Sequence, residues 1–195
     1  MDKNLSLEEQ QTLLHVAREA LEYGVRGKKL PPLDEASLPP TLLEQGVSFI
    51  TLTIRGELRG CIGALEARQP LAQDVREHAI AAALEDPRFP QVREDELSRI
   101  QIEVSCLTRP VPLEYKDAAD LLSKLRPHVD GVVLRYGFRR ATFLPQVWEK
   151  IPEPAEFMDN LCYKMGVAEN TWRVKHLEVL VYQVEEFHES QDNFI

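Results

Sequence analysis

The sequence has no apolar run that approaches the roughly 20 residues needed to cross a bilayer. Its first residues lack a basic stretch followed by an apolar one, so no secretory signal is expected. The three cysteines are odd in number and far apart, which argues against a disulfide framework and fits a reducing compartment. These absences predict a cytoplasmic protein without a membrane anchor.

Most sequence motifs that identify a known catalytic or binding function are also missing. The sequence has no phosphate-binding loop, no Gly-x-Ser-x-Gly turn and no Cys-x-x-Cys pair. Gly56, Gly60 and Gly63 do not have the spacing of a dinucleotide-binding loop. The five histidines form no close pair of ligands. The sequence therefore predicts no metal site and indicates no cofactor.

Positive charge is scarce, because 23 basic residues face 32 acidic ones and the net charge is −9. An acidic chain gains little from phosphate backbones or anionic lipids, which argues against nucleic-acid and membrane partners. The basic clusters at residues 26–29 and 139–140 are short, and we interpret them as solvated turn charges.

The first half of the chain indicates two helices around a hairpin. Ser6 and Glu9 form a capping box that begins a helix over residues 7–23, with Gly24 as its expected end. Residues 25–45 contain four prolines and predict a loop. Residues 47–54 and 58–63 predict a hairpin, followed by a helix from Pro70 to about Asp86.

The second half adds strands and shorter helices. Residues 100–106 alternate between apolar and polar side chains, and residues 131–136 and 139–144 predict a second hairpin. Helices are expected over 117–126 and 156–165, and a final strand over 177–187, apolar on both faces and therefore central. The pattern predicts an α+β fold with a mainly antiparallel sheet of five to six strands flanked by helices, and a smaller subdomain.

The strongest candidate for a functional site is residues 58–63, Leu-Arg-Gly-Cys-Ile-Gly, where an arginine, a cysteine and two glycines occur close together. Strand alternation places Arg59, Cys61 and Gly63 on one face, and the apolar residues with Gly60 on the core face. A cation beside a cysteine stabilises the thiolate, and glycines leave the backbone open to a ligand. The alternative is structural, because free cysteines are often buried and strand glycines often mark bulges.

Other candidates lie further along the chain. Asp86 and Arg88 belong to a rigid Asp-Pro-Arg-Phe-Pro segment, although they can also pair locally in a helix-ending turn. Polar residues on the alternating strand can line a cleft or be solvated. In a Leu-Pro-Gln-Val segment, Gln146 beside Pro145 can bind a ligand or fix a loop. The candidate cleft residues are Gly60, Gly63, Asp86, Arg88, Phe89, Glu103, Ser105, Pro145 and Gln146.

Five motifs occur together in one order: residues 58–63, 86–90, 102–105 (Ile-Glu-Val-Ser), 144–147 (Leu-Pro-Gln-Val) and 162–166 (Cys-Tyr-Lys-Met-Gly). This order resembles the AMMECR domain family, whose prokaryotic members are called AmmeMemoRadiSam system protein A. The resemblance covers residues 5–187 as a single domain. Ala64 and Met165 depart from the family pattern, in which a hydroxyl residue and a small alanine are usual.

The resemblance implies a larger sheet subdomain beside a smaller one, with the motif residues near the cleft between them. It also implies partners, namely a Memo-like protein and a radical S-adenosylmethionine protein. It supplies no reaction, so two interpretations stay open. In the first, Cys61 is a nucleophile or redox thiol that Arg59 stabilises, in a modification or small-molecule pathway. In the second, the chain is a non-catalytic adaptor that binds a peptide, an anion or a partner protein.

Overall fold

The computed structural model describes residues 5–189, which divide into two compact units. Unit 1 contains the residues up to 107 and those from 185 onward, and unit 2 contains residues 108–184. Both units combine helices with antiparallel strand pairs, which confirms the predicted α+β class, with the strands distributed over two sheets. No helix within residues 5–189 is long and apolar enough to cross a membrane.

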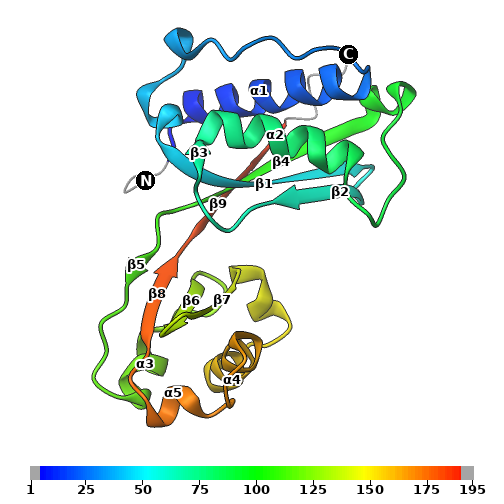
Figure 1. Ribbon diagram of the computed structural model, residues 1–195. Coiled ribbons are helices and arrows are strands. Elements are labelled where there is room, and N and C mark those ends of the chain that lie inside the picture. The colour runs from blue at the N-terminus through cyan, green and yellow to red at the C-terminus, as the bar shows by residue number, and fades with distance from the viewer. Residues whose placement is uncertain (1–4, 190–195) are drawn as a thin grey trace. The chain divides into compact units, whose positions relative to one another are not determined.

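Unit 1 is a sheet with two helices, α1 and α2, on one face (Figure 1). The strands run in the order β2-β1-β4-β9, and β3 pairs with β1. The strands are β1 (Gln45–Ile54), β2 (Glu57–Gly63), β3 (Gln69–Pro70), β4 (Ile100–Leu107) and β9 (Val184–His188). The helices are α1 (Leu7–Val25) and α2 (Leu71–Leu84), with short turns η1 (Glu35–Ser37), η2 (Pro40–Leu43) and η3 (Glu94–Arg99).

The alternation predicted for residues 100–106 is confirmed in β4. Ile102 and Val104 are fully buried in the cluster that α1 and α2 cover. Glu103 points to the other side and is half-buried. We call this second side of the sheet the open face; it carries the β1 residues Phe49 and Thr51, which pair with β4 in register.

The N-terminal helix begins as predicted but ends later. Ser6 Oγ accepts the amide of Glu9 at 3.3 Å, and the Glu9 carboxylate accepts the amide of Ser6 at 2.7 Å, which is the expected capping box. The helix passes through Gly24 and ends at Val25, so Gly24 is not its stop. A Cβ on Gly24 would lie 3.1 Å from Ile80 of α2, which shows that this glycine lets the two helices approach closely.

Unit 2 is a second sheet packed on short helices. Its strands run in the order β5-β8-β6-β7. They are β5 (Val111–Pro112), β6 (Gly131–Tyr136), β7 (Arg139–Phe143) and β8 (Glu178–Tyr182), and the helices are α3 (Ala118–Lys124), η4 (Pro145–Glu149), α4 (Pro154–Met165) and α5 (Thr171–Val174). Trp148 anchors the core: its ring stacks on Phe157 at 3.6 Å, and its Nε1 donates to the carbonyl of Asp130 at 2.7 Å.

The single final strand predicted over residues 177–187 is wrong. The segment forms β8 and β9, which belong to different sheets. The break falls at Gln183, whose amide donates to Thr108 Oγ1 and whose carbonyl accepts the amide of Thr108, both at 2.9 Å. The continuous apolar pattern hides this break because β8 is central in its sheet and Phe187 of β9 is buried in the core of unit 1.

Candidate functional site

The site in unit 1 begins with a β-bulge in β2. Leu52 of β1 pairs with Gly60, and the next residue, Thr53, pairs with Leu58. Arg59 is therefore an extra residue without a partner on β1. Because the bulge interrupts the alternation, Leu58 turns outward with 42% of its surface exposed while Gly60 stays buried. The prediction that Leu58 faces the core is wrong for this reason.

The bulge directs Arg59 toward the segment before β4. Its Nε and NH2 donate to the two carboxylate oxygens of Glu96 at 2.8 and 3.0 Å, and its NH1 donates to the carbonyl of Pro90 at 2.8 Å. The Arg59 hydrogen bond lowers the pKa of Glu96 from 4.5 to about 2, although burial opposes this shift. Arg59 thus binds residues 90–96 to β2. Its guanidinium N–H donors point toward that segment.

The two glycines of residues 58–63, Gly60 and Gly63, allow close packing. A Cβ on Gly60 would lie 2.1 Å from the backbone carbonyl oxygen of Ala82 in α2. A Cβ on Gly63 would lie 2.4 Å from the ring of Phe49. Side chains larger than hydrogen therefore do not fit, and the space that these glycines provide is occupied by the protein itself.

Asp86 and Arg88 cap the edge of β2 at Cys61. The Asp86 carboxylate accepts the amide of Cys61 at 2.8 Å, and Arg88 NH2 donates to the carbonyl of Cys61 at 3.2 Å. Asp86 also accepts from Arg88 Nε and NH2 at 2.9 and 2.7 Å, so the predicted local pair exists. These hydrogen bonds, first of all those from Arg88, hold the pKa of Asp86 well below its usual range despite burial.

The thiol of Cys61 lies among polar groups on the open face. Thr51 Oγ1 donates to its sulfur at 3.4 Å. Arg88 is the neighbouring cation: its pKa is raised chiefly by Asp86 and also by Cys61. The Arg88 side chain is 55% exposed, and its NH1 has no hydrogen-bond partner within residues 5–189. Phe89 lies beneath this guanidinium, with its ring centre 5.5 Å from the Arg88 Cζ atom.

Glu103 extends the polar row across the open face. Thr51 pairs with Cys61 on one side and with Glu103 on the other, so the three side chains lie in one row across three strands. Burial raises the pKa of Glu103, the charge of Glu186 raises it further, and His188 opposes both. Ser105 lies in the adjacent row beside Phe49, and 6% of it is exposed.

The structure brings together most of the predicted site residues, but not all. Arg59, Gly60, Cys61, Gly63, Asp86, Arg88, Phe89, Glu103 and Ser105 belong to unit 1. Pro145 and Gln146 belong to η4 of unit 2, where Pro145 is buried and Gln146 is exposed. Among the described residues, no group of histidines, cysteines and acids could hold a metal ion.

Sequence reasoning missed Thr51 and Glu96. Thr51 is an ordinary strand residue until the register places it opposite Cys61. Glu96 stands in an acidic run of three residues that is typical of a solvated turn. Its contact with Arg59 joins positions 37 residues apart, so no local signal marks it.

The structure is that of an α+β protein with two units. In the larger unit, the half-buried thiol of Cys61 lies beside Arg88, which the Asp86 carboxylate holds in place. The AMMECR1 family model matches residues 14–187, so the chain belongs to the AMMECR1 family. A protein of Methanothermobacter thermautotrophicus is 41% identical over 95% of this chain and 96% of its own. Protein MK0488 of Methanopyrus kandleri is 37% identical over 98% and 93%, respectively.

A solved structure confirms the fold. The crystal structure of the uncharacterized protein PH0010 from Pyrococcus horikoshii superimposes with a TM-score of 0.75 and 31% sequence identity. The alignment covers 95% of this chain and 94% of that one. The match therefore extends over both units.

Proposed function

We propose that this protein is a component of a modification or small-molecule pathway in which Cys61 supplies a reacting thiol and Arg88 its neighbouring cation. One observation carries the proposal: the thiol is the polar group of residues 58–63 that the fold does not use. Arg59 binds Glu96, Gly60 packs on Ala82, and the backbone of Cys61 is bound by Asp86 and Arg88. Within residues 5–189, by contrast, the sulfur receives the Thr51 hydroxyl and lies near the half-exposed Arg88 guanidinium, and neither contact holds an element of the fold together.

The surroundings suit a nucleophilic thiol. The thiolate is the reactive form of cysteine, and both a nearby guanidinium and a hydroxyl donor favour it. The NH1 donors of Arg88 are positioned by the buried Asp86 carboxylate and can bind an oxygen of a ligand. Glu103 lies two strands from Cys61 in the same row, and its raised pKa suits a carboxyl that keeps its proton more readily than usual and can take part in proton transfer.

The partners implied by the family resemblance belong to the same proposal. We infer that the chain works with a Memo-like protein and a radical S-adenosylmethionine protein in the cytoplasm. The three cysteines are free thiols, which supports a reducing compartment. In such a system the thiol would act on a substrate that a partner prepares or consumes, so this chain alone need not turn over.

A binding or adaptor role is the second candidate, and one observation favours it. Among the described residues, no histidine or carboxylate contacts the sulfur of Cys61 to accept its proton. In this role Arg88 would hold an anionic group, and Cys61 would serve packing. The adaptor role predicts that Cys61→Ser keeps both capture of the partner proteins and the activity of the pathway. The thiol role predicts that the same variant still captures the partners but that the activity of the pathway is lost.

The test is site-resolved alkylation of the native protein with iodoacetamide at pH 6 to 9, followed by mass spectrometry of each cysteine. We expect Cys61 to react at pH 7 several-fold faster than a free cysteine peptide, because the guanidinium and hydroxyl favour the thiolate. Cys106 and Cys162 serve as internal controls, because both are fully buried. A Cys61 that reacts only as fast as these two would contradict the proposal.

A further inference from the structure

Arg76 of α2 is a buried cation with few partners. Only 3% of its surface is exposed. Its NH2 donates to the carbonyl of Pro31 at 2.5 Å, in the segment that follows α1. Its Nε has no acceptor, and it is the one buried side-chain nitrogen or oxygen within residues 5–189 that lacks a hydrogen-bond partner.

The other shielded arginines of unit 1 are bound differently. In Arg18 and Arg59, whose side chains are 17% and 14% exposed, Nε and NH2 both donate to one carboxylate. Arg88 binds Asp86 along the same edge of the guanidinium. Arg76 is more buried than these, yet no carboxylate of the described residues lies within 4.0 Å of it.

The acidic neighbours of Arg76 on α2 are engaged elsewhere. Asp74 accepts from the amide and hydroxyl of Ser48 at 2.8 and 2.7 Å. Glu77 accepts from Gln69 and Gln73 at 2.8 and 2.9 Å. Neither carboxylate is therefore the counterion of Arg76, although both are within two residues of it.

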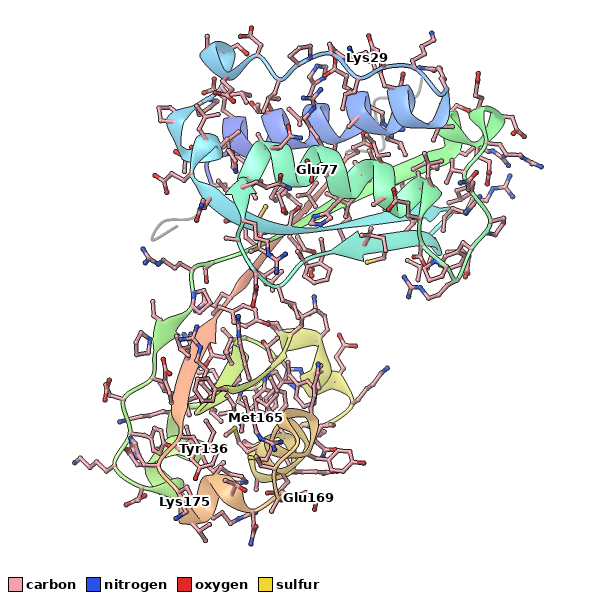
Figure 2. The ribbon with its side chains drawn as sticks, viewed as in Figure 1. Lys29, Glu77, Tyr136, Met165, Glu169 and Lys175 are labelled. Atoms are coloured by element: carbon pink, nitrogen blue, oxygen red, sulfur yellow. The ribbon has the colours of Figure 1, made fainter. Side chains whose placement is uncertain are left out.

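A guanidinium cannot shed its charge inside a protein, so burying one without a counterion destabilises the folded state. An apolar side chain of similar size would be more stable there. Lys28 and Lys29, both exposed, lie in the segment between α1 and η1. Figure 2 shows this segment running along the helices, with Lys29 labelled on it and Glu77 labelled on α2. Leu30 and Leu33 of that segment pack on the apolar core, and Pro31 between them accepts from Arg76.

We propose that Arg76 is the floor of a binding site for a small oxyanion, a phosphate group or a carboxylate, beneath residues 28–33. The oxyanion would accept from Nε, along the edge that carboxylates occupy in the other shielded arginines. Residues 28–33 cover this edge and Pro31 accepts from NH2, so binding requires that segment to shift aside. Its charge would complete the pairing that the acids of residues 5–189 do not provide. This site is separate from Cys61, since it lies on α2 under the segment after α1, whereas Cys61 lies on the open face of the sheet.

The experiment measures the thermal unfolding midpoint of the full chain in chloride buffer, and then with phosphate or acetate added at constant ionic strength. We expect a saturating rise of several degrees with at least one of them in the wild type, because binding to the native state stabilises it. Phosphate alone would identify a phosphate site, and acetate alone a carboxylate site. No rise with either anion would overturn the proposal.

Two variants complete the test. Arg76→Met should fold, unfold at or above the wild-type midpoint in chloride, and lose the response to the anion. Arg68→Met is the matched control, because Arg68 is 82% exposed, and it should keep the full response. An Arg76→Met variant that responds like the wild type would show a general salt effect. An Arg76→Met variant that fails to fold, or that unfolds far below the wild type in chloride, would show that the protein itself already satisfies the guanidinium. Each of these outcomes, like a response equal to that of the wild type, overturns the proposal.

Discussion

Replacing Gly60 by alanine tests whether this glycine serves packing or leaves room for a ligand. The added Cβ would lie 2.1 Å from the carbonyl oxygen of Ala82, where ordinary contacts are 3.4–4 Å. The obstacle is backbone at Ala82, which is buried, so no rotamer change relieves it and β2 must move by more than 1 Å. Overpacking usually costs about 1–3 kcal/mol, and we expect about 3 kcal/mol here.

The assay is urea unfolding of wild type and Gly60→Ala at pH 7, with Gly24→Ala as a matched control. A Cβ on Gly24 meets only the Ile80 side chain at 3.1 Å, which can shift, and alanine adds about 1 kcal/mol of helix propensity. The control should therefore unfold within about 1 kcal/mol of wild type. A Gly60→Ala protein as stable as the control would refute the packing argument and favour a ligand-facing glycine.

Three further predictions concern single groups. The pKa of Glu96 is about 2 when folded and 4.5 ordinarily, so its contribution to stability is complete above pH 4.5 and is lost as the pH falls toward 2. Glu96→Gln should abolish this acid-dependent change in unfolding free energy, which is about 3 kcal/mol for that difference in pKa. Trp148→Phe loses the 2.7 Å bond to Asp130 and part of the stacked ring, and should cost about 2–3 kcal/mol in a denaturant titration. Cys106, whose pKa is strongly raised by burial, should react with a thiol reagent only at the rate of unfolding, and native labelling would contradict its position in the core.

Local signals predicted much of the fold. The capping box at Ser6 and the alternation of β4 depend on residues a few positions apart, and the structure shows both. The hairpin turn at Gly56, with φ of +81°, follows from glycine's freedom to take positive φ. These features arise from short-range sterics and hydrogen bonds that a sequence pattern reports directly.

Features that depend on distant contacts were missed. The bulge at Arg59 is accompanied by a carboxylate 37 residues away, and nothing in residues 58–63 specifies it. The break at Gln183 depends on Thr108, which is 75 residues away. The candidate site was affected in the same way. The motif composition indicated Cys61 with Arg59 as its cation, but the long-range hydrogen bonds show that Arg59 binds Glu96 and that Arg88 binds at Cys61.

The central claim, that Arg88 and not Arg59 activates the Cys61 thiol, is tested most directly by one pair of variants. Arg88→Gln and Arg59→Gln each remove a guanidinium bound to a shielded carboxylate, so each controls for the lost stability of the other. The measurement is the iodoacetamide rate constant of Cys61 at pH 7 under conditions where both variants stay folded. We predict at least a five-fold decrease in Arg88→Gln and a change of less than about two-fold in Arg59→Gln, because a nearby cation favours the thiolate. A decrease in Arg59→Gln with an unchanged rate in Arg88→Gln would contradict the account.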